Sequence, residues 1–321
     1  MPASRQAASA TVPGMLSRRA TVAVCAAVIA VAALLLPVAL AGSRRVHARA
    51  GVMRYYLSLG DSLAQGMQPD TAGITRNTNQ GYTDQLYALE SRRIPRLKLV
   101  KLGCGGETTS SFLTGRGNPD ALILGCNPRG GSQTAAAERF LRAHHRPRQV
   151  ALVTLDIGAN DIVGCVHGAS VDDACVIHGL ERADKNLPVI MRRLRRAAAK
   201  GTPMAAMTLY DPFLQLYLLP GDQQEALTIN GYAKTINKTL ARLYRTRKFR
   251  VAHVDEAFKT YDTTHTTTLA GQPGPVPVAV AEVCRLTWMC APAPVGPNIH
   301  ANEAGYGVIA GAFARAFGRL R

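Results

Sequence analysis

The sequence has few charged and few aromatic residues, and its acidic residues are scarcer than its basic ones. Charged residues make up 18% of the 321 positions and aromatic residues 6%, with a single tryptophan, Trp288. Hydrophobic residues reach 47%, a globular composition that excludes a disordered or fibrous chain. No nucleic-acid-binding motif, internal repeat or low-complexity tract is present, so we expect no DNA or RNA partner.

No acidic residue lies in the first 41 positions, where arginines are followed by an unbroken apolar run, Ala20–Ala41. A run of this length is sufficient to cross a bilayer. Small-x-small sequences at Ala39–Ala41 and Ala48–Ala50 are candidate signal-peptidase sites. We interpret residues 1–41 as a signal peptide or an uncleaved membrane anchor, and residues 42–50 as a spacer. Both interpretations place the rest of the chain outside the cytoplasmic membrane.

No two cysteines have C-x-x-C spacing, which argues against zinc ligation and thioredoxin-like chemistry. Cys25 lies in the apolar run, and six cysteines follow it. An even number of cysteines in an exported chain indicates disulfides, and six allow fifteen pairings. We favour pairing in sequence order because it closes three short loops: Cys104–Cys126, Cys165–Cys175 and Cys284–Cys290.

The chain is strongly basic, with 38 Lys and Arg against 21 Asp and Glu and a formal charge of +17. A basic surface can hold anionic envelope polymers or lipid headgroups, and contact with such a surface is the partner hypothesis. A compositional bias toward arginine is the simpler explanation, and we favour it. We expect a monomer.

Short apolar strands alternate with stretches long enough for helices. The expected strands are Arg54–Leu59, Lys98–Leu102, Val150–Ile157, Met204–Leu209 and Arg250–Val254. Separations of roughly 40–50 residues leave room for a crossover helix each time, which favours a parallel sheet. We predict an α/β fold, a three-layer α/β/α sandwich with a five-stranded parallel sheet, as one domain over residues 51–321. Function is expected at the carboxyl edge of the sheet.

Two helices are predicted from hydrophobic periodicity, over Leu187–Leu194 and Tyr232–Leu243. Tyr232 belongs to the apolar stripe of the second helix, so we expect it in the core. Weaker helices are expected at Gly81–Arg93, Gln133–Ala143 and Ala301–Arg319.

Four segments at the expected strand and helix ends have residues suited to acyl transfer. The first three strands lead into Gly60–Leu63 (GDSL), Leu102–Thr109 (LGCGGETT) and Gly158–Asp161 (GAND). Before the last helix, Pro297–Tyr306 reads PNIHANEAGY and includes His300. Together they offer a hydroxyl nucleophile, a base, and the backbone and amide donors that stabilise a tetrahedral oxyanion.

These segments, in this order across residues 54–309, resemble the four blocks of the SGNH, or GDSL, family of serine esterases and lipases. The resemblance implies a flavodoxin-like fold for the predicted catalytic domain. It implies that Ser62 is the nucleophile and His300 the general base. It also implies three oxyanion donors: the N–H of Ser62, the N–H of Gly106 and the amide of Asn160. Neither a metal nor a cofactor is implied.

The last block departs from the family pattern D-x-x-H, because Pro297 occupies the position of the aspartate. The chain is similar to secreted members with six cysteines paired in sequence order, in which a main-chain carbonyl three residues before the histidine replaces the carboxylate. We therefore predict a Ser62–His300 dyad oriented by the carbonyl of Pro297. The alternative acceptors are Asp211, Asp255 and Asp262, of which Asp255 is more simply explained as a structural cap.

The resemblance implies an exported carboxylic-ester hydrolase that forms an acyl-serine intermediate, with acyl lipids as the first substrate class. A carbohydrate O-acetylesterase of envelope or plant polysaccharide is the alternative enzyme, since one fold hosts both. A non-catalytic envelope-binding module is the alternative that involves no reaction. Trp288 is equally consistent with lining an acyl-binding cleft and with covering the core.

Overall fold

The computed structural model describes residues 52–118, 126, 131–168 and 170–320. The expectations for residues 1–41 and 42–50 concern positions outside these described residues. None of the helices in the described ranges is both long and apolar enough to cross a membrane.

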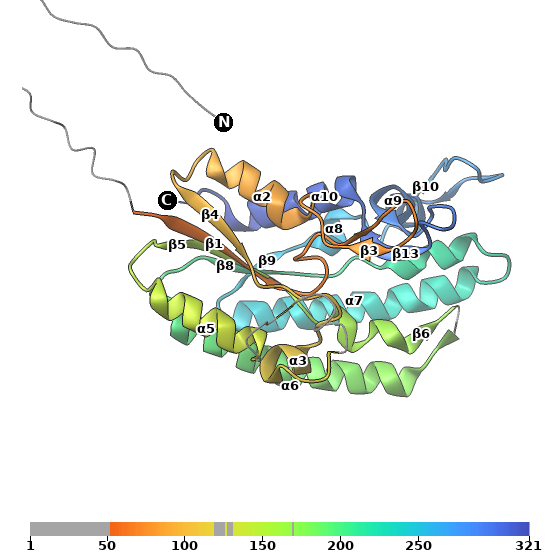
Figure 1. Ribbon diagram of the computed structural model, residues 1–321. Coiled ribbons are helices and arrows are strands. Elements are labelled where there is room, and N and C mark those ends of the chain that lie inside the picture. The colour runs from red at the N-terminus through yellow and green to blue at the C-terminus, as the bar shows by residue number, and fades with distance from the viewer. Residues whose placement is uncertain (1–51, 119–125, 127–130, 169, 321) are drawn as a thin grey trace, which may run out of the picture. The chain divides into compact units, whose positions relative to one another are not determined.

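The central sheet has five parallel strands, as predicted (Figure 1). Their order is β4, β1, β5, β8, β9, so the first strand in the sequence lies inside the sheet and the second lies at one edge. This 2-1-3-4-5 order of the five sheet strands is that of the flavodoxin-like folds, in which the order of strand addition reverses between β1 and β5. The bounds are β1 Arg54–Gly60, β4 Leu97–Lys101, β5 Val150–Asp156, β8 Met204–Met207 and β9 Arg250–Ala252.

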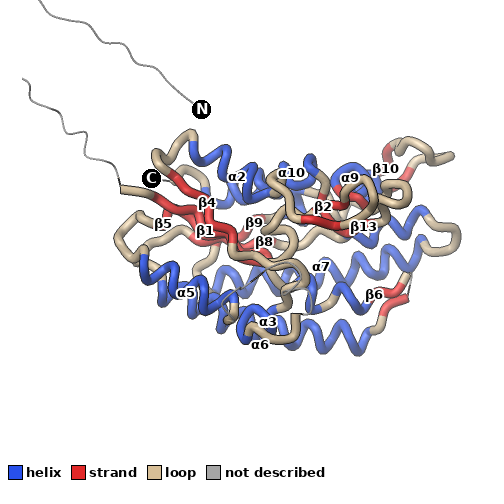
Figure 2. Tube along the Cα trace, in the orientation of Figure 1, coloured by secondary structure: helices blue, strands red, loops and turns tan. Residues whose placement is uncertain are grey.

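Helices cover both faces of the sheet, because its strands present apolar residues on both sides. Leu57 packs with α5, α6 and α7 on one face, whereas its neighbour Tyr56 packs with α2 and α10 on the other. Figure 2 shows the helices on the two sides of the strands. The helix bounds are α2 Tyr82–Ser91, α3 Thr109–Thr114, α5 Gln133–Ala143, α6 Asp173–Ala197, α7 Gln223–Thr246, α8 Val254–Ala257, α9 Val278–Leu286 and α10 Glu303–Phe317.

All five predicted helices are present, but the two strongest are longer than their apolar stripes. α6 begins at Asp173, where the side chain of Asp172 accepts a hydrogen bond from the N–H of Cys175 at 2.9 Å. The N-terminal halves of α6 and α7 extend beyond the ends of the strands (Figure 1). These two segments therefore lie beside the carboxyl edge of the sheet rather than across its face.

Short antiparallel strand pairs and 3₁₀ helices lie in the connections, and the sequence did not indicate them. The pairs are β2 Gln68–Pro69 with β3 Thr75–Arg76, β6 Val166–His167 with β7 Ser170–Val171, β10 Thr266–Thr267 with β11 Val276–Pro277, and β12 Thr287–Trp288 with β13 Asn298–Ala301. The 3₁₀ helices are η1 Ala159–Asp161, η2 Val163–Cys165 and η3 Pro212–Leu218. β13 has the greatest consequence, because it carries His300.

The three disulfides follow sequence order, as predicted. Cys104–Cys126, Cys165–Cys175 and Cys284–Cys290 have Cα–Cα distances of 5.6, 5.5 and 5.0 Å. Each closes a short loop, which stabilises the fold by roughly 2–4 kcal/mol per disulfide. Cys104 follows β4, and Cys165–Cys175 closes the segment that contains the β6–β7 pair.

Candidate active site

Ser62 lies in the tight turn directly after β1, at the carboxyl edge of the sheet. Gly60, the last residue of the strand, has a φ of 145°. A Cβ at this position would lie 2.2 Å from the carbonyl oxygen of Asp156, so only glycine fits against β5. The carbonyl of Ser62 accepts hydrogen bonds from the N–H groups of Gln65 and Met67 at 3.2 and 3.0 Å. The turn therefore fixes the backbone on both sides of the serine.

Two buried carboxyl groups accept hydrogen bonds from backbone N–H groups of this turn. Asp61 accepts a hydrogen bond from the N–H of Leu63 at 3.0 Å, and Asp156 accepts one from the N–H of Ala64 at 3.0 Å. Burial raises the pKa of Asp61 to about 6 and raises the pKa of Asp156 well above its usual range. The hydroxyl of Tyr82 is hydrogen-bonded to Asp156. Asp61 thus has a structural role.

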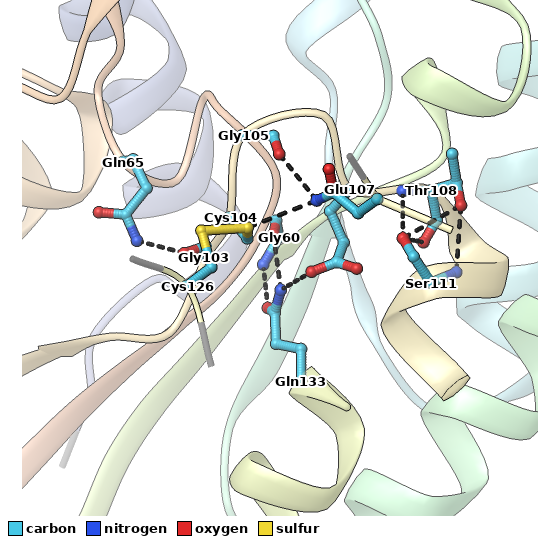
Figure 3. Close-up of a disulfide and its surroundings, with 11 residues drawn as sticks. Gly60, Gln65, Gly103, Cys104, Gly105, Glu107, Thr108, Ser111, Cys126 and Gln133 are labelled. Carbon is cyan, nitrogen blue, oxygen red and sulfur yellow. Dashed lines mark hydrogen bonds between the residues drawn. A yellow bond between two sulfur atoms is a disulfide. The ribbon is translucent and has the colours of Figure 1, made fainter. Parts of the chain in front are cut away.

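The glycine-rich loop after β4 lies beside the end of β1, where the N–H of Cys104 donates to the carbonyl of Gly60 at 3.1 Å (Figure 3), and its residues are not among those that line the cleft described below. Gly106 has a φ of 69°, in the left-handed region that favours glycine. The disulfide of Cys104 joins this loop to Cys126. Glu107, the next residue, is buried, and desolvation raises the pKa of its carboxyl group.

Gln133, the first residue of α5, connects this loop to β1, and sequence reasoning missed it. Its amide oxygen accepts the N–H of Gly60 at 2.7 Å, and its nitrogen donates to the carbonyl of Gly60 at 2.9 Å. The same nitrogen lies 3.1 Å from a carboxyl oxygen of Glu107 (Figure 3). The side chain is fully buried. Gln133 therefore fixes the strand end that carries Ser62 relative to the loop that carries Gly106.

Asn160 comes from η1, after β5, and meets both neighbouring segments. Its amide nitrogen donates to the carbonyl of Glu107 at 3.0 Å and lies 3.4 Å from a carboxyl oxygen of Asp61. The first bond fixes the orientation of the amide, and the second contact is long. Asp161 accepts hydrogen bonds from the N–H and hydroxyl of Thr109, both at 2.8 Å. Both amide hydrogens of Asn160 therefore have protein acceptors in this structure, and a substrate oxygen would have to replace the long contact with Asp61.

His300 lies on β13, and its ring is held differently from the prediction. Nδ1 lies 2.7 Å from Oδ1 of Asn298, and among the described residues no hydrogen bond joins the ring to Pro297. The predicted role of the Pro297 carbonyl is therefore wrong. Oδ1 of Asn298 also accepts the backbone N–H of His300 at 3.1 Å, and this Asx turn places the Asn298 side chain beside the imidazole. Burial lowers the pKa of His300 to about 4.

The three aspartates considered as alternative acceptors bind other groups. Asp211 accepts hydrogen bonds from the N–H of Phe213 and the amide of Asn230, both at 3.0 Å. Asp255 accepts the hydroxyl of Thr208 at 2.6 Å, which confirms its structural role. Asp262 lies 2.8 Å from His265, at the surface. Within the described ranges, none of them is hydrogen-bonded to His300.

Ser62, Asn160 and His300 line one cleft, which has a volume of about 120 Å³. Away from these polar groups its walls are almost entirely apolar. They come from the 3₁₀ helices, the β6–β7 pair and the N-terminal halves of α6 and α7, with Ile162, Val166, Val171, Val176, Phe213 and Ile229 among the lining residues. The structure contains no hydrogen bond between Ser62 and His300, and catalytic hydrogen bonds often tighten only when substrate is bound.

The structure shows where two aromatic residues, Tyr232 and Trp288, lie relative to the cleft. Tyr232 is 39% exposed and lines the cleft, and its hydroxyl lies 3.1 Å from a carboxyl oxygen of Asp173. The expectation that it belongs to the core is wrong, because α7 has passed beyond the sheet at this point. Trp288 is not among the residues that line the cleft. It pairs with Asn298 in the hairpin that carries the histidine, and its indole N–H donates to Gln68 at 3.3 Å.

Comparison with known proteins identifies the family. The model of the GDSL-like lipase/acylhydrolase family matches residues 58–308. The chain belongs to this family. The family's hydrolase activity agrees with the resemblance found in the sequence, and the site residues fall within the matched range.

The chain also aligns with solved structures, and the first of the following three supports the fold. A phospholipase A1 from Streptomyces albidoflavus aligns with a TM-score of 0.50 and 18% identity over 82% of this chain and 99% of that chain. An extracellular lipase from Streptomyces rimosus gives 0.49 and 16% over 82% and 99%. An acetylxylan esterase from Geobacillus stearothermophilus gives 0.49 and 15% over 84% and 96%. Among curated proteins, none is similar enough in sequence to match.

Asn160→Ala is expected to lower kcat by about 10²–10³-fold, the usual effect of removing one oxyanion donor. KM should change little, because the donor acts on charge that develops only in the transition state. Steady-state kinetics on a soluble ester would measure both. A raised KM with unchanged kcat would instead make Asn160 a substrate-binding residue.

Proposed function

We propose that this chain is an exported carboxylic-ester hydrolase that acts on acyl lipids or related esters through an acyl-serine intermediate. The observation that carries the proposal is that Ser62 and His300, far apart in the sequence, line the same apolar cleft. A hydroxyl becomes a nucleophile when a neighbouring base accepts its proton, and His300 is the base in this cleft.

In acylation, Oγ of Ser62 attacks the ester carbonyl while Nε2 of His300 accepts the hydroxyl proton. The resulting oxyanion is stabilised by the N–H groups of Ser62 and Gly106 and by the amide of Asn160. His300 then protonates the leaving alcohol, which leaves the acyl group on Ser62. In deacylation a water molecule attacks with His300 again as base, and the acid is released with Ser62 restored.

The apolar walls of the cleft support an acyl chain as the group bound beside Ser62. An acetyl group would contact only a small part of a wall that extends to the β6–β7 pair and the N-terminal half of α6. Burying each methylene of a longer chain contributes roughly 0.8 kcal/mol. Export is supported by the three disulfides, which persist in oxidising compartments.

The acyl preference is tested with p-nitrophenyl esters from acetate to palmitate and with acetylated xylan. We expect kcat/KM to rise from acetate to longer chains. Val176→Trp should then lower kcat/KM for the best long-chain ester by at least about tenfold and leave acetate within about twofold, because a filled pocket excludes methylenes. Val176 is buried in the cleft wall.

Ile177→Trp is the matched control for this variant. Ile177 is the next residue on α6, is 55% exposed and is not among the cleft-lining residues. It should leave the whole ester series unchanged. A preference for acetate and acetylated xylan would indicate an O-acetylesterase, and activity on none of the substrates would indicate an envelope-binding module.

A further inference from the structure

We propose that the side chain of Asn298 takes the place of the missing triad carboxylate, so that Ser62, His300 and Asn298 form the catalytic arrangement. The inference rests on the proposed function, in which His300 is the base. Asn298 does not touch the reacting atoms. It is a positioning residue, which acts by holding the imidazole in one tautomer and one orientation.

The hydrogen bonds around Asn298 determine which tautomer that is. Its Oδ1 lies 3.1 Å from the backbone N of His300 and 2.7 Å from Nδ1 of the same residue. A backbone N–H can only donate, so the side-chain atom that it meets must be the amide oxygen rather than the nitrogen. The same oxygen can only accept from Nδ1, which must therefore carry a proton. Nε2 is left with its lone pair, as a general base requires.

A second hydrogen bond, made by the amide nitrogen, also holds the side chain of Asn298. The nitrogen of Asn298 donates to the hydroxyl of Thr75, on β3, at 2.9 Å. Asn298 also pairs with Trp288 in the β12–β13 hairpin, and the hydroxyl of Tyr210 donates to the carbonyl of Ile299 at 2.7 Å. The amide therefore has little freedom to rotate, and the imidazole that it holds has little freedom either.

A neutral amide differs from a carboxylate in one respect that can be measured. A carboxylate would stabilise the imidazolium and raise the pKa of His300, whereas an amide oxygen leaves the cost of burial uncompensated. Burial lowers this pKa to about 4. The titratable groups that line the same cleft are Asp61, Tyr210, Asp211 and Tyr232. None of these four is hydrogen-bonded to the ring in the described part of the chain.

The test compares Asn298→Ala and Asn298→Asp by full pH–rate profiles on a soluble ester. The wild-type acid limb of kcat/KM should lie near pH 4, since activity falls as pH decreases through the pKa of the base. Asn298→Ala should lower kcat by about 10²–10⁴-fold, the range that general base catalysis contributes. Asn298→Asp should retain kcat within about tenfold at neutral pH and move the acid limb upward by about one pH unit or more.

Asn302→Ala is the matched control. Asn302 lies two residues after His300, and its side chain caps α10 by accepting the N–H of Gly305 at 3.0 Å. Removing the cap should lower the midpoint temperature of unfolding and leave the acid limb in place. Asp211→Asn, Asp255→Asn and Asp262→Asn should each lower kcat by less than about tenfold.

A measurement independent of activity reports the tautomer itself. In ¹⁵N NMR spectra above pH 6, His300, assigned by the signals lost in His300→Gln, should show a protonated Nδ1 and an unprotonated Nε2. The Asn298→Ala variant should show a mixture of tautomers. An unchanged tautomer and acid limb in both Asn298 variants would overturn the inference, as would a roughly 10⁴-fold loss in one aspartate variant. Absence of wild-type esterase activity with the expected spectra would reject only the proposed function.

Discussion

Ser62→Ala is expected to lower kcat by about 10⁶-fold, the loss measured when the nucleophile of a serine hydrolase is removed. The hydroxyl is the only group in the proposed mechanism that forms the acyl bond, and no other residue can replace it. The fold should be retained, because the backbone of Ser62, and not its side chain, makes the hydrogen bonds of the turn. Steady-state kinetics and a thermal melt measure the two effects.

A fluorophosphonate probe gives the same prediction a chemical readout. The wild-type protein should gain one phosphonate on the peptide that contains Ser62, and the variant should gain none. Ser58→Ala is the matched control, since Ser58 is buried on β1 and its hydroxyl has no hydrogen-bond partner among the described residues. It should leave labelling and kcat unchanged. Residual activity above about 1% of wild type in Ser62→Ala would make another group the nucleophile.

His300→Ala is expected to cause a loss of similar size, about 10⁶-fold in kcat, because nucleophile and base act as one unit. Without the base, only hydroxide can remove the serine proton. The residual activity of the variant should therefore increase steadily with pH, whereas the wild-type rate should be flat above its acid limb. Kinetics from pH 4 to pH 10 would separate the two profiles.

His265→Ala is the control for this variant. His265 is exposed and bonded to Asp262, away from the residues that line the cleft. It should keep wild-type kinetics. If His300→Ala retained the wild-type pH profile with only a small loss, a different residue would be the base.

The unpredicted features of the site depend on contacts between residues distant in sequence. Gln133 begins a helix that the sequence predicted, but nothing in its neighbourhood indicates that it binds Gly60, 73 positions earlier. Tyr232 fits the apolar stripe of α7, and only the length of that helix beyond the sheet places it in the cleft wall. Local periodicity reports which residues share a helix face, and it does not report what that face meets.

The sequence by itself determined the parallel sheet and the four segments that meet at the site, and it favoured the disulfide pairs that the structure contains. Strands and helices are visible because their apolar periods are local, and parallel strands bring their carboxyl ends to one edge. Only the tertiary structure decided how His300 is held. β13 is a four-residue strand that forms against β12, and no local signal distinguishes it from a loop. The resemblance found in the sequence pointed to the carbonyl of Pro297, three residues before the histidine, whereas the structure presents the side chain of Asn298, two residues before it.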